Sequence, residues 1–182
     1  MFSIELDEGV RLFALEPHHA QEFHAHIDRG REFIGRHVGF PDRATDTASA
    51  RRLLEDFARR AAADTGRMYG IRADGVLVGG VLFPSFDARN GTCEIGCWVE
   101  PAAAGRGLVT RACRVLIDWA FHERGMRRVE WHADSANEKS LAVAARLGMT
   151  REGVLRENYL HRGQVQDTEI WSVLAREWPA RT

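Results

Sequence analysis

The stretch of this sequence best suited to bind an anion is a glycine-rich turn between an expected strand and an expected helix. The turn is Ala104-Gly105-Arg106-Gly107. Glycine lets the backbone turn sharply and lets a ligand approach where a Cβ would otherwise stand. The first N–H groups of the following helix lack partners within the helix, and the helix dipole makes that end positive. The pattern therefore favours an anion such as a pyrophosphate at residues 104–110.

Such a turn is a short motif, so an ordinary strand-to-helix connection is the alternative interpretation. The sequence lacks the GxxxxGK[ST] spacing of a Walker loop, and no third glycine stands where a dinucleotide-binding fingerprint requires it. These differences disfavour a generic nucleotide-binding module.

The elements that hold the turn follow from the spacing of apolar residues. Over residues 92–99 apolar side chains alternate with others, which predicts a half-buried strand with Glu94 on the face opposite the cysteines. Pro101 cannot donate to a sheet, so this strand should end near Glu100. After Gly107 the apolar period becomes helical, which predicts a long amphipathic helix.

The rest of the chain predicts a mixed α/β sheet in one domain over residues 1–182. Asp74-Gly75 is a strong hairpin signal, and Ser135-Ala-Asn-Glu138 has the spacing of a capping box. The expected order is a strand at 10–15, a helix from Pro17 that Gly39-Phe-Pro41 ends, a helix at 47–63, strands at 68–73 and 76–83, a polar loop at 84–90, the central strand and helix, a strand at 129–133, a short helix ending at Gly148, and strands at 153–161 and 164–174.

The composition is that of a soluble globular protein with one core, at 182 residues, 45% hydrophobic and 28% charged. A formal net charge of -1 argues against nucleic-acid binding by bulk electrostatics. The sequence has no run of about 18 apolar residues and no basic, hydrophobic leader. Membrane insertion and export are therefore not expected, and the cytoplasm is the expected location.

Cysteine and histidine do not form a metal-ligand pattern. Cys93 and Cys97 are expected to pack as small apolar groups on one face of their strand. His18-His19 and His24-x-His26 have no HExxH or Cys/His ligand spacing beside them. The sequence therefore predicts no metal site.

Four segments carry a family resemblance: the strand CEIGCWV, the turn and helix AAAGRGLVTRA, the helix start NEKS, and the tail EGVLRENYLHRGQVQDTEIWSVLAREW. Together they resemble the GNAT family of N-acetyltransferases, and specifically its RimJ/RimL-like branch. The match runs in the family's order from Val76 onward, whereas the first 65 residues match only in layout. The resemblance implies a single-domain GNAT fold, with a mixed, mostly antiparallel twisted sheet flanked by helices.

The resemblance also implies an acyl-CoA-dependent N-acetyltransferase, which moves an acetyl group from acetyl-CoA to a primary amine by direct attack in a ternary complex. The family loop is usually Q/R-x-x-G-x-G/A, and its first position here is Ala102, which removes a side chain but leaves the phosphate-binding amides. Arg106 and Arg111 are secondary candidates for charge near the nucleotide. The cofactor-binding residues that the resemblance implies are Trp98, Val99, Ala104, Gly105, Arg106, Gly107, Leu108, Val109, Thr110 and Asn137.

The catalytic roles implied by the resemblance fall on Glu94 and Ser140. Acyl transfer to an amine needs a neutral nucleophile, a positioned thioester, oxyanion stabilisation and protonation of the leaving thiolate. Glu94 corresponds to the family's strand glutamate, the general base, although a salt-bridged or solvated carboxylate is the alternative. Ser140 would protonate the thiolate and Asn137 would contact the pantetheine arm. Both residue types also populate first helical turns, but Ser135 is the expected cap. A backbone N–H near Val99 would stabilise the oxyanion.

Three further residues offer alternative chemistry. Tyr159 and Tyr69 are alternative proton donors. Cys97 offers a rival route through an acyl-cysteine, which would need a neighbouring base and a lowered pKa. The expected apolar placement of Cys97 argues against that route.

The acceptor class follows from the pKa values of amines. A protein α-amine has a pKa of about 8 and a lysine of about 10.4, so at pH 7 the α-amine is neutral far more often. We therefore expect a protein N-terminal α-amine or a small-molecule amine as acceptor. A non-catalytic acyl-CoA-binding protein, or an enzyme that uses another acyl-CoA such as succinyl-CoA, remains open. A homodimer is implied by the resemblance alone.

Overall fold

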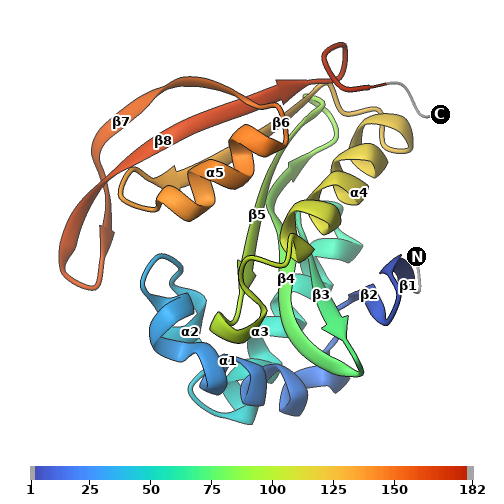
Figure 1. Ribbon diagram of the computed structural model, residues 1–182, viewed down its shortest axis with the longest axis vertical. Coiled ribbons are helices and arrows are strands. Elements are labelled where there is room, and N and C mark those ends of the chain that lie inside the picture. Colours follow the sequence, from blue (N-terminus) through green and yellow to red (C-terminus); the bar gives the residue numbers. More distant parts are fainter. Residues whose placement is uncertain (1–2, 180–182) are drawn as a thin grey trace.

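Alternating apolar residues form eight strands that pair into one sheet, and helices pack on both of its faces (Figure 1). The computed structural model describes residues 3–179. The strands are β1 (Ser3–Asp7), β2 (Val10–Ala14), β3 (Arg67–Ala73), β4 (Val76–Asp87), β5 (Thr92–Val99), β6 (Arg128–Asp134), β7 (Thr150–His161) and β8 (Gln164–Leu174). The helices are α1 (Ala20–Gly35), α2 (Phe40–Arg43), α3 (Thr47–Ala62), α4 (Leu108–His122) and α5 (Glu138–Arg146), with single 3-10 turns at Pro17–His19 and Pro101–Ala103.

The sheet runs in the order β1-β2-β3-β4-β5-β6-β8-β7. β5 and β6 pair in parallel, and every other neighbouring pair in this order is antiparallel. A parallel pair needs a long crossover connection, which α4 supplies between β5 and β6. The predicted fold class, a single-domain, mixed and mostly antiparallel sheet flanked by helices, is confirmed.

Two clusters of buried apolar side chains hold the helices on opposite faces of the sheet. α4 and α5 pack over one cluster, which includes Leu116 of α4 and Trp131 of β6. α1 and α3 pack over the other, which includes Phe23, Leu54 and Trp98. The strands between them are therefore covered on both sides.

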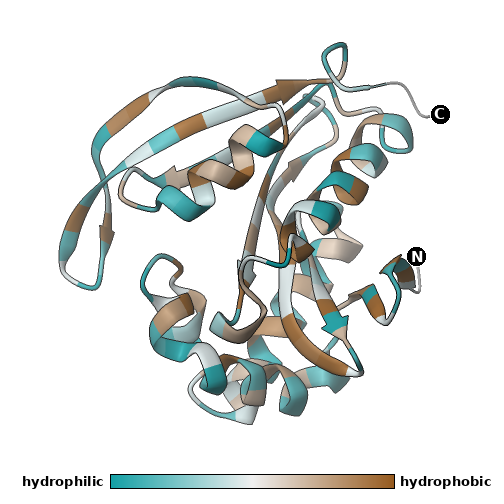
Figure 2. Cartoon of the chain, viewed as in Figure 1, coloured by the Kyte–Doolittle hydropathy of each residue, from teal (hydrophilic) through white to brown (hydrophobic). Residues whose placement is uncertain are grey.

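The ribbon formed by β7 and β8 is less covered than the centre of the sheet. Figure 2 shows hydrophobic and hydrophilic residues mixed along it. Three of its apolar side chains are largely exposed: Leu155 by 49%, Leu160 by 67% and Val165 by 60%. This ribbon therefore adds little to either cluster beyond the end that lies next to β6.

Local sequence signals placed several elements correctly. The helix predicted at 47–63 is α3, and its N-cap Asp46 accepts a hydrogen bond from the Ser49 N–H. The turn between β3 and β4 has φ of 49° at Asp74 and 81° at Gly75, the left-handed pair of a tight hairpin. β5 ends at Val99, one residue before the predicted end.

Three predictions near the ends of elements were wrong. β1 was missed, because a five-residue edge strand with mostly exposed positions carries a weak apolar pattern. The loop predicted at 84–90 is part of β4 as far as Asp87, because a register shift between Leu82 and Ser85 accommodates Pro84. The helix expected to end at Gly39-Phe-Pro41 ends earlier, at Gly35, and Pro41 lies in the first turn of the short helix α2, where its missing N–H costs nothing.

Gly80 lies where β4 passes the buried ring of Trp98. A Cβ at Gly80 would overlap that ring and the backbone carbonyl of Tyr69. Gly153 in β7 makes a matched comparison, because a Cβ there would meet nothing within 4 Å and its φ is not positive.

We therefore expect Gly80→Ala to lower the free energy of unfolding by at least about 2 kcal/mol through overpacking. Gly153→Ala should change it by less than about 1 kcal/mol, toward stabilisation, because alanine restricts the unfolded chain. Urea denaturation of both variants measures the difference. Equal effects of the two substitutions would contradict the packing described for Trp98.

Candidate active site

The parallel pairing of β5 and β6 is short. It runs from Thr92 opposite Arg128 to Glu94 opposite Glu130 and then stops. Beyond that point β5 continues beside β4 as far as Val99, and β6 continues beside β8 as far as Asp134. The two central strands therefore separate after Glu94, as Figure 1 shows.

The separation leaves backbone groups of β5 without a strand neighbour on one side. The Glu100 N–H bonds the Val78 carbonyl of β4 at 2.9 Å, and the next antiparallel pairs are Gly79 opposite Val99 and Gly80 opposite Trp98. Hydrogen-bonded and non-hydrogen-bonded pairs alternate along such a ladder, so the N–H of Val99 points away from β4. It points to the side where β6 has turned away, which suits the role of oxyanion donor predicted there.

The predicted anion-binding turn follows directly. Gly105 and Gly107 have φ of 80° and 73°, in the left-handed region that glycine adopts most readily. Gly107 is the N-cap of α4 and has no side chain to bond the first-turn amides. By contrast, Asp46 and Asn137 cap α3 and α5 with their side chains. The amides that open α4 are thus left for a ligand.

Two arginines lie near this turn. The Arg106 side chain is exposed. Arg111 pairs with Asp7 of β1 at 3.4 Å, and its Nε is buried with no hydrogen-bond partner in the described part of the chain. The role of Arg106 and Arg111 near a nucleotide stays a prediction.

Glu94 is the last residue of β5 that pairs with β6, and its side chain is 25% exposed. Its neighbours Cys93 and Ile95 belong to the cluster under α4, so Glu94 points to the face covered by α1 and α3. Burial raises the pKa of this carboxyl, His132 at 3.7 Å lowers it, and Glu130 raises it further. The net upward shift suits a group that takes up a proton.

Ser140 lies on the opposite face of the sheet, in the first turn of α5. Its Oγ accepts a hydrogen bond of 2.9 Å from the Trp131 indole, which belongs to the cluster under α4 and α5. This bond fixes the oxygen and leaves the hydroxyl hydrogen able to donate elsewhere. Glu94 and Ser140 therefore flank the separation of β5 and β6 from its two sides.

The predicted cap of α5 was wrong. Asn137, and not Ser135, is the N-cap, and its Oδ1 accepts from the Ser140 N–H at 3.2 Å. The Ser135 Oγ is buried with no hydrogen-bond partner among the described residues. Capping uses only the oxygen of Asn137, so its amide nitrogen can still donate to a ligand.

The side chain of Trp98 belongs to the core, and only its backbone is placed to meet a ligand. Its ring is 4% exposed and packs in the cluster under α1 and α3. Its indole N–H donates to His26 Nε2 at 3.0 Å. The sequence pattern correctly predicted that Trp98 and Glu94 share a face of β5. It did not indicate that α1 and α3 bury this face at Trp98.

His26 and Glu100 are buried polar groups that sequence reasoning missed. Because Nε2 of His26 accepts from Trp98, Nδ1 must carry the hydrogen that bonds Glu100 at 3.2 Å. Burial lowers the pKa of His26 to about 4, more than the contact with Glu100 raises it. Arg29 also donates to Glu100, at 3.0 Å. This network ties α1 to the end of β5, just before the turn that contains Gly105 and Gly107.

The alternative chemical groups lie in less suitable places. Tyr69 is buried in β3, and burial raises the pKa of its hydroxyl. Tyr159 lies on β7, 48% exposed, with its ring stacked on His161. Cys97 packs beside the buried Cys113, whose pKa is raised by burial and by that neighbour. A cluster of thiols against the apolar core does not activate a nucleophile.

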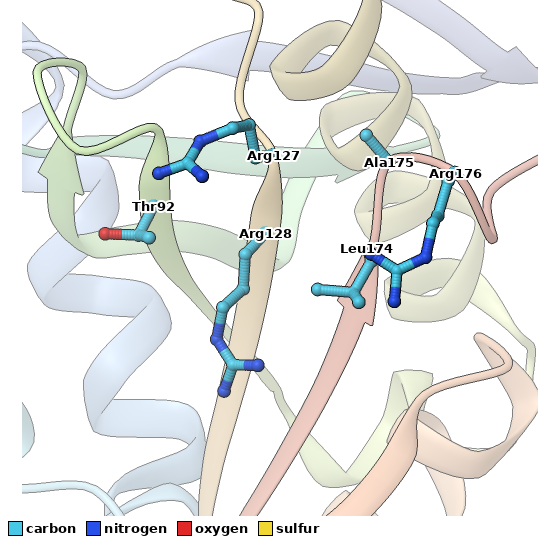
Figure 3. Close-up of a pocket in the computed structure, with 6 residues that line it drawn as sticks. All are labelled: Thr92, Arg127, Arg128, Leu174, Ala175 and Arg176. Atoms are coloured by element: carbon cyan, nitrogen blue, oxygen red, sulfur yellow. The ribbon is translucent and has the colours of Figure 1, made fainter.

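A cavity of about 370 Å³ lies at the other end of the central strands (Figure 3). It is lined by Thr92, Leu174 and Ala175 with three arginines, Arg127, Arg128 and Arg176. Thr92 and Arg128 form the first pair of β5 and β6, so this cavity lies away from the separation. It is not part of the candidate site.

No group of three or more His, Cys, Asp or Glu side chains suited to a metal ion occurs within residues 3–179. Among the same residues, no helix is long and apolar enough to cross a membrane.

Comparisons with known proteins agree with this architecture. The family model "Acetyltransferase (GNAT) domain" matches residues 10–150. The chain is 32% identical over 179 residues to "Putative ribosomal N-acetyltransferase YdaF" of Bacillus subtilis (strain 168), covering 98% of both proteins.

Solved structures show the same fold. A crystal structure of a "Probable acetyltransferase" superimposes with a TM-score of 0.91 at 32% identity, covering 98% of this chain and 99% of that one. The ribosomal α-N-protein acetyltransferase RimL, solved in complex with coenzyme A, superimposes with a TM-score of 0.90 at 19% identity, covering 94% and 97%. The family model spans most of the chain, and the strands, turn and helices stand in the order that the motifs predict. The chain therefore belongs to the GNAT family of acetyltransferases, with RimJ/RimL-like proteins among its relatives.

Proposed function

We propose that this protein transfers an acetyl group from acetyl-CoA to a primary amine by direct attack in a ternary complex. The observation that carries the proposal is the arrangement around the separated strands. An uncapped helix start lies at one end, the Val99 N–H points into the separation, and Glu94 and Ser140 lie on its two sides. Each of these suits one requirement of acyl transfer.

The acyl donor would bind along the separation. Its pyrophosphate would meet the amides from Gly105 to Thr110, where no capping side chain competes. Its pantetheine arm would lie along β5 and meet the amide nitrogen of Asn137. The published RimL complex contains coenzyme A, which supports this choice of donor.

The chemistry then needs few groups. Glu94 would accept a proton from the acceptor ammonium through a bridging water, and the neutral amine would attack the thioester carbon. The Val99 N–H would stabilise the oxyanion as the C–N bond forms. Ser140, whose oxygen is held by Trp131, would donate its hydrogen to the departing thiolate as the C–S bond breaks and regain one from the nitrogen of the tetrahedral intermediate.

A protein N-terminal α-amine or a small-molecule amine is the acceptor that we propose. Relatives are named as ribosomal N-acetyltransferases, which supports the first class, and a spermidine N(1)-acetyltransferase of Escherichia coli (strain K12) supports the second. A second candidate function, acyl-CoA binding without turnover, is disfavoured because Glu94 and Ser140 flank the same separation. The homodimer and the cytoplasmic location remain predictions.

Thiol release from acetyl-CoA, with an amine panel as acceptors, tests the proposal. The panel holds peptides with free N-termini, N-blocked lysine peptides, polyamines and aminoglycosides. We expect turnover on one class, and we expect Ser140→Ala to lower kcat by about 10²-fold or more. Ser135→Ala is the matched control, because Ser135 Oγ bonds no partner among the described residues.

If no amine gives thiol release while coenzyme A still binds, the result would favour acyl-CoA binding without turnover or an enzyme that uses a different acyl donor. Succinyl-CoA separates those two outcomes. Failure of coenzyme A to bind would remove the proposal altogether.

The anion site can be tested separately by adding a competing charge. Thr110→Asp places a carboxylate in the first turn of α4, which satisfies the dipole but repels a phosphate. We expect the Kd for coenzyme A to rise at least about tenfold, with no loss of thermal stability. Thr110→Asn is the neutral control and should bind nearly as well as the wild type. Calorimetric titration gives both constants, and equal Kd values for Asp and Asn would place the phosphates elsewhere.

Glu94→Gln should affect activity and stability in opposite directions. Because burial raises the folded-state pKa of Glu94, its stabilising contribution is present below the ordinary carboxyl pKa and is lost as pH rises through the raised value. Glutamine stays neutral, so the variant should unfold at a higher temperature than the wild type at pH 7 and not at pH 4. Its kcat should fall by about 10²-fold or more. Matching melting temperatures at both pH values would argue against a raised pKa.

A further inference from the structure

Three ionisable side chains lie in a row where β5 and β6 separate. Glu94 and Glu130 face each other across the last parallel pair, and His132 follows two residues later on the same face of β6. His132 Nδ1 lies 3.7 Å from a Glu94 oxygen, and its Nε2 lies 2.9 Å from a Glu130 oxygen. The imidazole thus lies between the two carboxylates.

The charge on Glu130 decides which imidazole nitrogen carries hydrogen. Burial alone would raise the pKa of Glu130, but hydrogen bonds from Arg128 and His132 outweigh it and leave the pKa below its usual range. Arg128 donates to Glu130 at 2.7 Å and is itself held by Glu152. An ionised carboxylate only accepts, so the hydrogen lies on Nε2 of His132. In the neutral ring, Nδ1 then presents its lone pair to Glu94.

The proposed reaction releases a proton that the lone pair on Nδ1 of His132 could accept. An acceptor ammonium loses two protons when it becomes an amide: the C–N bond forms, the C–S bond breaks, one proton ends on the thiol and the other goes to water. Glu94 takes up a proton readily because its pKa is raised, but its side chain is 25% exposed against 33% for His132, so the imidazole has more contact with solvent through which to release a proton. A neighbouring base that reaches water would reset Glu94 in each turnover.

We propose that His132 takes the proton from Glu94 at Nδ1 and releases it from the same nitrogen to a solvent water, while the Nε2 hydrogen stays bonded to Glu130 and holds the ring in the required tautomer. The inference rests on the proposed function, because it needs an amine that loses a proton at Glu94. The 3.7 Å gap is closed by one bridging water or a small rotation of either side chain. The His132 side chain is 33% exposed, so water reaches it.

Within residues 3–179, the carboxylates in contact with His132 are those of Glu94 and Glu130. Ile170 of β8 lies opposite His132 and does not titrate. Asp134, the next carboxylate along β6, accepts from the Ala136 N–H and contacts His37 at 3.2 Å. Arg128, on the same face of β6, donates to Glu130 and Glu152.

Turnover of a histidine variant provides the first test. We expect His132→Ala to lower kcat by about tenfold to a hundredfold without changing the KM for acetyl-CoA, and added imidazole to restore most of the rate. His122→Ala is the control, because His122 is exposed at the end of α4 and should keep the wild-type rate. A purely structural histidine would not respond to imidazole.

A second readout needs no substrate. Nitrogen NMR of the wild-type protein should show His132 as the Nε2–H tautomer at pH values where the ring is neutral. Glu130→Gln should keep that tautomer, because the amide oxygen still accepts, whereas Glu130→Ala should give a mixture.

The outcomes separate the two proposals. A neutral ring that carries its hydrogen on Nδ1 would overturn the relay, and so would an unimpaired His132→Ala or one that imidazole does not rescue. No thiol release by the wild-type protein would instead overturn the proposed function, and the relay with it.

Discussion

The separation of β5 from β6 after Glu94 is the constraint on which the rest of the site depends. Each strand keeps its other neighbour, so β5 follows β4 and β6 follows β8 in diverging directions. The connection between them returns from the end of β5 to the start of β6, where Arg128 pairs with Thr92, and the turn at 101–107 and α4 form it. The separation leaves the N–H of Val99 facing away from β4, and Gly107 leaves the first amides of α4 without a side-chain cap.

Local patterns in the sequence were sufficient to predict the glycine turn and the strand and helix on either side of it. The alternation in β5, the apolar face of α4 and the two positive-φ glycines are each properties of neighbouring residues. Periodicity and turn chemistry therefore predicted them, and the family resemblance added their use. The face of Glu94 was also predictable, because alternate residues of a strand share a face.

Contacts between distant parts of the chain could not be predicted in this way. Trp98 and His26 are 72 residues apart in sequence, and neither residue type indicates which residue it will contact. The cap of α5 was missed for a different reason. Serine and asparagine cap equally well, so spacing alone could not choose between Ser135 and Asn137. The contact of His132 with Glu94 depends on the register of two strands joined by a helix.

The hydrogen bond between Trp98 and His26 makes the indole hydrogen a probe of local opening by hydrogen exchange. The indole hydrogen is buried under α1 and held by a nitrogen of that helix. Because it is buried and hydrogen-bonded, it exchanges with deuterium in the solvent only when a local opening breaks its bond to His26. The hydrogen–deuterium exchange rate of this indole hydrogen therefore reports how often the contact between α1 and the end of β5 opens.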